Sequence, residues 1–390
     1  MASSAAHLLS LLFLVSLSLL PLDSFSLSST YEEEYHKWVS WHGEQYRQKL
    51  LFNSMEVSSE LKDDLHHPKK LDHKLAEAEK NRVWIKVAQD GSGNFTSLRD
   101  ALDSIEEKNT RRIIIQIAPG IYREKVVIKK KKPFITLLGD SRNPPTFTGN
   151  DTAATLGGDG NPMRTYHSAT VAINSHYFVA INIRFENTAP NPEIGQIGGQ
   201  AVALRISGNK AAFYNCSFFG HQDTLYDHKG THYFKNCFIQ GSVDFIFGYG
   251  RSLYENCHMN SISTDVASVT AQKRTNVSLS SGFSFLNGTV SGSGLVYLGR
   301  AWGDHSRVVF AYTYLDKVVI PEGWNDWGIP ARESSVYYGE YKCSGPGANM
   351  TERVQWIRRL TDAEAEPFLG THFVDGEKWL WAEQPTAYLS

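Results

Sequence analysis

Short runs of apolar residues, separated by Gly, Asn and Asp, fill the chain from Val83 onward. The clearest runs are Ile113–Ile117, Val126–Ile128, Ile135–Leu138 and Ala169–Ile173. Runs this brief, rich in β-branched residues and bounded by turn formers, are typical of strands. Only Ser97–Glu106 offers an early helical spacing of apolar residues. The pattern therefore predicts a chain made mostly of short strands.

Three tetrads with the same ending repeat inside this region: Phe213–Cys216, Phe234–Cys237 and Tyr254–Cys257. Their asparagines, Asn215, Asn236 and Asn256, are 21 and then 20 residues apart. A period of about 20 residues indicates a solenoid, in which strands stack in parallel about 4.8 Å apart. Asparagine at one corner of each coil tolerates left-handed backbone and can bond its neighbours. An antiparallel sandwich with accidental echoes is the alternative; we predict an all-β, right-handed parallel β-helix.

The end of the chain departs from this repeat. Thr361 and Glu364 can cap each other reciprocally and begin a helix. We expect this C-terminal helical segment to pack across the coils and cover an open edge.

Two aspartates hold equivalent stations in consecutive repeats: Asp223 and Asp244 each follow a ladder asparagine by eight residues. Stacked coils would place their carboxyl groups side by side. Adjacent carboxylates do not ionise independently, so one acid and one base can coexist near neutrality. Such a pair can attack with one member and protonate with the other. The alternative is that both aspartates only cap turns of the coil.

Residues near the two aspartates favour a catalytic role for the pair over a turn-capping role. Gln222 precedes Asp223, and Gln200 lies 22 residues earlier, about one coil away. Their amides could donate to an oxyanion, provided that the backbone bends so that Gln222 and Asp223 converge. Arg300 can hold a carboxylate through a forked pair of hydrogen bonds, and Trp302 offers a flat face to a sugar ring.

The first 82 residues divide into segments of different composition. Leu8–Leu20 is an apolar run interrupted only by serines, too short to span a bilayer but suited to a secretory signal. It has no Lys or Arg before it, and an anchor or a buried helix is the alternative. We expect a signal peptide at 1–28, a polar extension at 29–82 and a catalytic domain at 83–390.

Secretion agrees with six Asn-x-Ser/Thr glycosylation triplets, at Asn94, Asn150, Asn215, Asn276, Asn287 and Asn349. The four cysteines are Cys216, Cys237, Cys257 and Cys343. They allow up to two disulfides with three connectivities, or the three in the repeat form a stack of small buried residues. The formal net charge of −2 excludes a strongly basic overall surface for nucleic acid.

Five stretches, taken together, resemble the pectinesterases (pectin methylesterases), particularly the plant type. They are Gly120–Glu124, Gln200–Leu204, Gln222–Tyr226, Asp244–Gly248 and Leu298–Trp302, in the order of the family, within residues 84 to 385. The resemblance implies a secreted carboxylic ester hydrolase of the cell wall that releases methanol from galacturonate methyl esters in pectin. It also implies a monomer without a cofactor or metal, no lasting membrane contact, and pectin and a proteinaceous inhibitor as partners.

The resemblance assigns roles to individual residues. Asp244 is implied as the nucleophile, and Asp223 as the acid that protonates methanol and then acts as base toward water. Gln222 and Gln200 would stabilise the oxyanion, and Arg300 would orient Asp244 near substrate. The resemblance also implies that five residues contact the substrate: Thr165, Gln200, Arg300, Trp302 and Trp324.

The chain departs from the family pattern in three places. Ala301 replaces the usual proline, which leaves the turn carrying Arg300 less rigidly fixed. The stretch Ala189–Gly199 is longer than usual and is expected to lengthen one wall of the cleft. The residues between the signal and the catalytic domain are too few for the inhibitor-like helical pro-region of many plant relatives.

Two other functions share this scaffold. A β-helical glycosidase or lyase would also use paired acids, although the glutamine pair favours an ester. A silent wall-binding protein would lack one of the catalytic residues, and none is missing. The calculated pI is 6.7, so the protein as a whole does not attract an acidic polysaccharide strongly. Electrostatic binding of such a polymer must depend on charge in the cleft itself.

Overall fold

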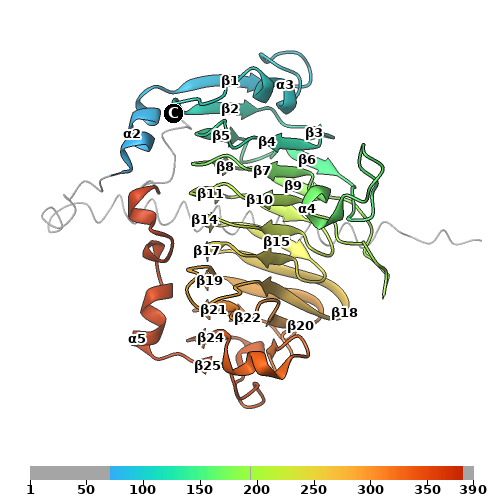
Figure 1. The fold of residues 1–390 in the computed structure, drawn as a ribbon, viewed down its shortest axis with the longest axis vertical. Coiled ribbons are helices and arrows are strands. Elements are labelled where there is room, and N and C mark those ends of the chain that lie inside the picture. The colour runs from blue at the N-terminus through green and yellow to red at the C-terminus, as the bar shows by residue number, and fades with distance from the viewer. Residues whose placement is uncertain (1–70, 194, 381–390) are drawn as a thin grey trace, which may run out of the picture. The chain divides into compact units, whose positions relative to one another are not determined.

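The computed structural model describes residues 71–380 except residue 194, and their strands wind into coils stacked along one axis (Figure 1). Every paired strand of the two sheets runs parallel to its neighbour, and the fold is the predicted right-handed parallel β-helix. The sheets contain eleven and fourteen strands. Most of the expected strands appear at their predicted positions, although the run at Ala169–Ile173 becomes a strand only from Val171.

The eleven-stranded sheet contains, in spatial order, β1 (Val83–Val87), β2 (Ile113–Ile117), β5 (Ile135–Leu138), β8 (Val179–Ile181), β11 (Ala211–Tyr214), β14 (Thr231–Lys235), β17 (Arg251–Glu255), β19 (Gly282–Leu286), β21 (Arg307–Ala311), β24 (Tyr337–Tyr341) and β25 (Arg358–Arg359). The second sheet has two arms, because the long strand β18 (His258–Gln272) pairs with β15 through its first residues and with β16 through its last. The first arm contains β3 (Ile121–Tyr122), β6 (Thr146–Gly149), β9 (Arg184–Asn187), β12 (Ser217–Phe219) and β15 (Phe238–Gly241). The second arm contains β4 (Val126–Ile128), β7 (Val171–Ile173), β10 (Leu204–Ile206), β13 (Leu225–Asp227) and β16 (Ile246–Gly248). β20 (Thr289–Arg300) continues both arms beyond β18 and pairs with β22 (Tyr314–Leu315) and β23 (Trp324–Asn325).

The helices are short. They are α2 (His73–Lys80), α3 (Leu98–Asp103), α4 (Arg164–Ser168), α5 (Asp362–Ala365) and the 3-10 turns η1 (Pro330–Ser334), η2 (Pro346–Ala348), η3 (Glu366–Phe368), η4 (Thr371–Val374) and η5 (Gly376–Lys378). The helix expected at Ser97–Glu106 is α3, and the Ser97 side chain caps it by accepting from the Asp100 amide. Within the described residues, no helix has both the length and the apolar composition that crossing a bilayer requires.

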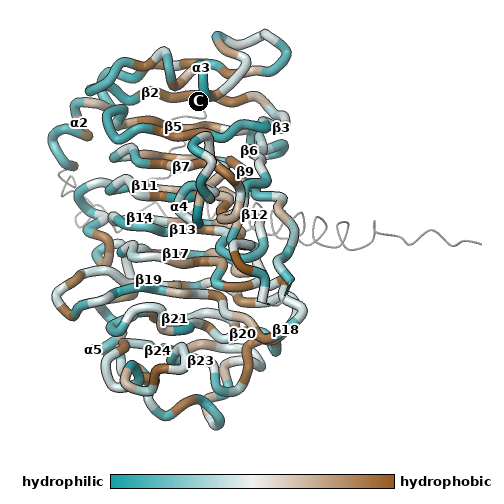
Figure 2. The backbone as a smooth tube through the Cα atoms, turned by 45° about the vertical axis from the view of Figure 1, so that its right-hand side comes forward, coloured by the Kyte–Doolittle hydropathy of each residue, from teal (hydrophilic) through white to brown (hydrophobic). Residues whose placement is uncertain are grey.

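The interior of the coils is a continuous apolar column, visible as brown segments that recur along the stacked strands (Figure 2). Its centre is a ladder of rings with one ring from each coil: Phe213, Phe234, Tyr254, Phe285 and Phe310. Successive ring centroids are 4.7, 4.6, 4.6 and 4.4 Å apart, and the ring planes are nearly parallel. This spacing is that of parallel strands, so the ladder keeps neighbouring coils in register.

The corner asparagines behave as the repeat predicts. Asn215, Asn236 and Asn256 all have positive φ, at 50°, 52° and 54°. The Asn256 side-chain amide donates to Asn236 Oδ1 at 3.3 Å, so this corner forms part of a hydrogen-bonded ladder. The cysteine that follows each asparagine is buried, and all four cysteines are free thiols. The alternative of a buried stack, rather than disulfides, is therefore the one observed for the repeat.

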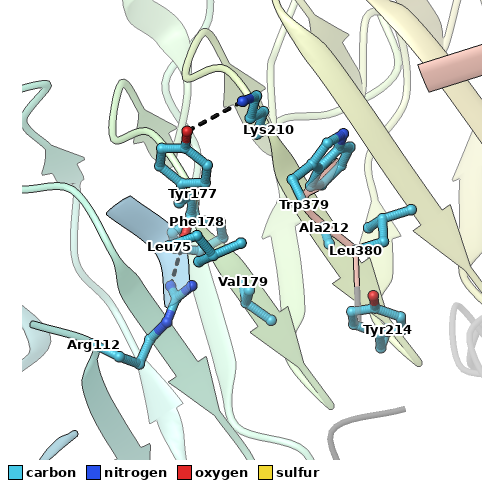
Figure 3. A pocket seen from close by; sticks show the side chains of 10 residues that line it. All are labelled: Leu75, Arg112, Tyr177, Phe178, Val179, Lys210, Ala212, Tyr214, Trp379 and Leu380. Atoms are coloured by element: carbon cyan, nitrogen blue, oxygen red, sulfur yellow. Dashed lines mark hydrogen bonds between the residues drawn. The ribbon is translucent and has the colours of Figure 1, made fainter. Parts of the chain in front are cut away.

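A cover of α2 and the C-terminal turns packs on the outer face of the eleven-stranded sheet (Figure 1). Leu75 of α2 lies beside Trp379 and Leu380 around a cavity of only about 20 Å³ (Figure 3). Lys210 donates to the Tyr177 hydroxyl at this cavity, at 3.1 Å. The capping box at α5 is present as predicted, but the segment covers the face of the sheet and not an open edge. Because α2 belongs to this cover, the folded part begins before Val83.

We predict that Phe234→Ala lowers the free energy of unfolding by about 3–5 kcal/mol, because it removes a fully buried ring from the ladder and leaves a cavity. Urea denaturation followed by tryptophan fluorescence measures this loss. Phe234→Leu, which fills most of the space, should cost clearly less. A loss below about 1 kcal/mol for the alanine variant would show that the ladder does not hold the coils in register.

Candidate active site

Asp223 and Asp244 occupy the same position on two neighbouring coils. The register pairs Leu225 of β13 with Ile246 of β16, so the residues two positions earlier, Asp223 and Asp244, also correspond. The Asp223 amide donates to the Val243 carbonyl at 3.0 Å, which ties one coil to the next beside Asp244. Both aspartates have positive φ, 66° and 49°, so the backbone bends at this point as the prediction required. The expected stacking of the pair is confirmed.

Asp244 is held from two further coils. Arg300, at the end of β20, donates from Nε to Asp244 Oδ1 at 2.8 Å and from Nη2 to Oδ2, which makes a forked ion pair. Ser268 of β18 donates to Oδ1. The Asp244 side chain is 7% exposed, so these partners fix its orientation and place positive charge beside it.

Asp223 has a different environment. Its side chain is 8% exposed, and no ion pair forms on it among the described residues. Burial raises the pKa of the Asp223 carboxyl well above its usual value, and the neighbouring Asp244 raises it further, while Arg300 opposes the shift. The pair is therefore asymmetric: Asp244 has the cation, and Asp223 retains a proton more readily.

The two glutamines lie beside the pair. The Ala201 amide donates to the Gln222 carbonyl at 3.1 Å, so Gln200 and Gln222 lie on adjoining coils. Leu204 pairs with Leu225, a step of 21 residues, and the two glutamines are therefore offset by one position. Neither side-chain amide has a hydrogen-bond partner within residues 71–380 as described, and both are partly exposed. Their N–H groups remain available to a ligand.

The outer surface of the second arm, here called the site face, is unusually aromatic. Tyr226 and Phe247 stack with centroids 4.2 Å apart, and Trp302 lies 6.1 Å from Phe247. On the other side, α4 carries the half-buried Thr165, and its next residue, Tyr166, meets Tyr226 edge-on. Trp302, in the turn after β20, and Thr165, in α4, thus lie on either side of Tyr226 and Phe247.

Trp324 does not belong to this surface. Its side chain is 1% exposed, and its Nε1 donates to Glu340 at 2.9 Å inside the coils. The expectation that Trp324 contacts substrate is wrong, since β23 turns this ring inward. Trp327, three residues later in the same motif, is half-buried, lies 3.9 Å from the Arg300 guanidinium and packs against the aromatic cluster of the site face.

The structure shows what two of the departures from the expected sequence pattern do, the residue Ala301 and the long stretch 189–199. The Ala301 amide donates to the Asn325 carbonyl at 2.9 Å, a bond that proline could not make, so the turn after Arg300 is fixed by hydrogen bonding. Asn191, in the long stretch 189–199, accepts from the Ser242 hydroxyl at 2.9 Å. That stretch therefore reaches the turn that carries Asp244.

The sequence pattern did not predict two residues that contact the site, Ser268 and Trp327. Ser268 follows Asp244 by 24 residues, a longer step than the 20 or 21 of the repeat, and simple counting misses it. Trp327 was available in its motif, but periodicity could not tell which tryptophan faces outward. In the part of the chain that the structure describes, no three His, Cys, Asp or Glu side chains lie close enough together to hold a metal ion.

Comparison with known proteins gives concordant results. The Pectinesterase family model matches residues 84–377. The chain is 45% identical over 305 residues to Probable pectinesterase 8 of Arabidopsis thaliana, covering 76% of each chain. Its structure resembles a pectin methylesterase from carrot with a TM-score of 0.70 and 34% identity, covering 76% of this chain and 94% of that one. It also resembles a pectin methylesterase solved in complex with a hexasaccharide, with a TM-score of 0.63 and 26% identity, covering 78% and 98%.

The raised pKa of Asp223 predicts a pH-dependent difference in stability between the wild type and Asp223→Asn. Folding favours the protonated carboxyl, so the wild type loses stability as pH rises from the unfolded value of about 3.9 through the raised folded value. The variant lacks this loss and should become more stable relative to the wild type, by about 1.4 kcal/mol for each pH unit between the two pKa values. Urea denaturation of both proteins between pH 4 and pH 8 measures the difference. A difference that is flat, or that changes in the opposite direction, would contradict the raised pKa.

Proposed function

The chain belongs to the pectinesterase family and is a carboxylic ester hydrolase, and we propose that it demethylates galacturonate esters in pectin through Asp244 and Asp223. The observation that carries the proposal is the asymmetric pair: Asp244 in a forked contact with Arg300, beside a buried Asp223 without a cation of its own. An esterase of this type needs one carboxylate that attacks and one carboxyl that donates a proton.

In the first step, an oxygen of Asp244 attacks the ester carbonyl carbon and the carbonyl oxygen becomes negatively charged. The free amides of Gln222 and Gln200 donate to this oxyanion. The tetrahedral species collapses, the bond to the methoxy oxygen breaks, and Asp223 protonates that oxygen. Methanol leaves, and Asp244 remains joined to the sugar carboxyl as an anhydride.

In the second step, Asp223 is a carboxylate and takes a proton from water. The resulting hydroxide oxygen attacks the sugar carbonyl carbon, and the bond to Asp244 breaks. The products are a galacturonic acid carboxyl group, ionised Asp244 and protonated Asp223, so the site returns to its starting state. The new carboxyl group then loses its proton to solvent and becomes a carboxylate. Arg300 stays bonded to Asp244 when the charge returns.

Substrate binding follows from the surface around the pair. Trp302 offers an aromatic face next to Phe247, and Thr165 offers a hydroxyl from α4 on the opposite side. A hexasaccharide is bound in one structurally similar pectin methylesterase. By analogy, we infer that a pectin chain lies across the site face, with the reacting ester over Asp244.

We further infer secretion to the cell wall, where pectin occurs. The apolar run Leu8–Leu20 and the residues up to position 70 lie outside the described part of the chain, and the inferred signal peptide at 1–28 rests on sequence alone. Amino-terminal sequencing of the protein secreted by a plant host would give the cleavage site.

Replacement of the two aspartates tests the proposed roles. Asp244→Asn should abolish methanol release from methylated pectin, and Asp223→Asn should slow it by about 10²–10⁴-fold. Methanol is measured by a coupled alcohol oxidase assay. Asp103→Asn on the exposed face of α3 is the matched control and should retain full activity.

Retained activity in Asp244→Asn would remove Asp244 from the nucleophile role. The chain length of the treated pectin, measured by size-exclusion chromatography, separates the esterase from a glycosidase or lyase on the same fold. Shortened polymer without methanol would overturn the esterase proposal.

Gln222→Ala should lower kcat by about 10²–10³-fold with little change in KM, because the lost donor acts on charge that develops only in the transition state. Steady-state kinetics on methylated oligogalacturonides measure both constants. A rise in KM at constant kcat would instead make Gln222 a ground-state binding residue.

A further inference from the structure

The helix that carries Thr165 has little support of its own. α4 is five residues long, no side chain caps its N-terminus, and its first residue, Arg164, has a positive φ of 55°. A helix this short is not stable in water by itself, so contacts with the coils must fix it. The position of the Thr165 hydroxyl therefore depends on what α4 packs against.

Arg205 lies directly against α4. It belongs to the outer face of β10, where the register places it between Ala172 of β7 and Tyr226 of β13. Its guanidinium carbon lies 3.7 Å from the centroid of the Tyr166 ring, and Arg205 is only 3% exposed. Stacking of a planar guanidinium on an aromatic ring is strongest where water is excluded. The contact between Arg205 and Tyr166, here called the clasp, therefore joins α4 to the site face.

Hydrogen bonds fix the clasp from the side of the coils. Arg205 Nη1 donates to Ser207 Oγ at 2.5 Å and to Asn174 Oδ1 at 3.1 Å. Because Ser207 accepts from Arg205, its own proton is available to His228 Nδ1, which lies 2.9 Å away. Burial and two neighbouring cations lower the pKa of His228 to about 4, so its Nδ1 is free to accept. The His228 ring also meets the Tyr166 ring edge-on at 5.3 Å, which supports α4 from a second side.

Arg205 is a buried cation that no carboxylate balances within residues 71–380 as described. Its Nε is buried without a hydrogen-bond partner, and burial lowers the pKa of the guanidinium. Keeping a cation in such surroundings costs stability. An apolar side chain would cost less if packing were the only requirement at this position. The cost therefore indicates a role for Arg205 in the site.

We propose that Arg205 is a positioning residue: through Tyr166 it holds α4 so that the Thr165 hydroxyl reaches the bound pectin chain. This role rests on the proposed function, and it deepens that function by naming the residue that fixes one wall of the substrate site. None of the bonds of Arg205 described above goes to Asp223 or Asp244. Loss of its guanidinium should therefore weaken substrate binding and leave the chemical step intact.

Steady-state kinetics on methylated oligogalacturonides test this expectation. Arg205→Met keeps an apolar stem and removes the guanidinium, and it should raise KM about fivefold or more with kcat within about twofold of the wild type. Binding is lost equally in the ground state and the transition state, which is why KM carries the effect. Arg184→Met is the matched control, because the Arg184 guanidinium stacks on Phe219 at 4.0 Å on the first arm, away from the site. It should leave KM unchanged.

A double-mutant cycle shows whether Arg205 acts through α4. Thr165→Ala alone should raise KM about fivefold, the worth of one hydrogen bond. In the Arg205→Met protein, the same change should raise KM by less than about twofold more, because the hydroxyl no longer reaches the substrate. Independent effects that multiply would overturn the positioning role and would assign Arg205 a substrate contact of its own.

Tyr166 gives a second route that does not alter the buried side of the clasp. Tyr166→Leu removes the ring from the half-buried face of α4 and should raise KM as Arg205→Met does. Tyr166→Phe keeps the ring and should recover most of the wild-type KM. Hydrogen exchange of the amides from 163 to 168 should be faster in Tyr166→Leu and Arg205→Met than in the wild type, and unchanged in Arg184→Met. Unchanged exchange in both clasp variants would overturn the inference.

Failure of the positioning role is distinguishable from failure of the proposed function. A wild-type protein that releases no methanol from methylated pectin would overturn the proposed function. Wild-type activity together with an unchanged KM in Tyr166→Leu and Arg205→Met would overturn the positioning role alone. Thermal melting of each variant checks that the fold is retained.

Discussion

The parallel register between β13 and β16 determines the geometry of the whole site. Each coil adds one strand at about 4.8 Å, and this step places Asp223 beside Asp244 at the same station. The ring ladder inside the coils and the asparagine corners outside them hold the register from both sides. A slip by one residue would turn Tyr226 and Phe247 inward and separate the carboxyl groups. The scaffold therefore determines the distance on which the chemistry depends.

Within that fixed distance, the surroundings give the two carboxyl groups different properties. Arg300 and Ser268 both bond to Asp244, whereas Asp223 is buried without a cation. The contacts to Asp244 come from later coils, on β18 and β20, so the pair depends on the stacking of at least four consecutive coils. The same stacking brings the loops after β13, β16 and β18 together beside the site.

Much of this was visible in the sequence, because a solenoid converts residue spacing directly into position. The asparagine repeat predicted the fold, and the count of eight residues predicted the pairing of the aspartates. Positions that depend on side-chain direction or on irregular steps were not predictable. Trp324 points into the core while Trp327 faces outward, and Ser268 lies beyond a step of 24 residues. Ala301 suggested a looser turn, but its amide supplies a bond that the sequence pattern could not reveal.

The central claim is that Asp244 attacks while Asp223 transfers the proton. Oligogalacturonides esterified with trifluoroethanol test it directly, because this alcohol departs without protonation. With such an ester, Asp223→Asn should still form the anhydride but fail to hydrolyse it, and should release a burst of about one equivalent of alcohol per enzyme. Asp244→Asn should release none. A burst from Asp244→Asn, or no burst from Asp223→Asn, would contradict this division of labour.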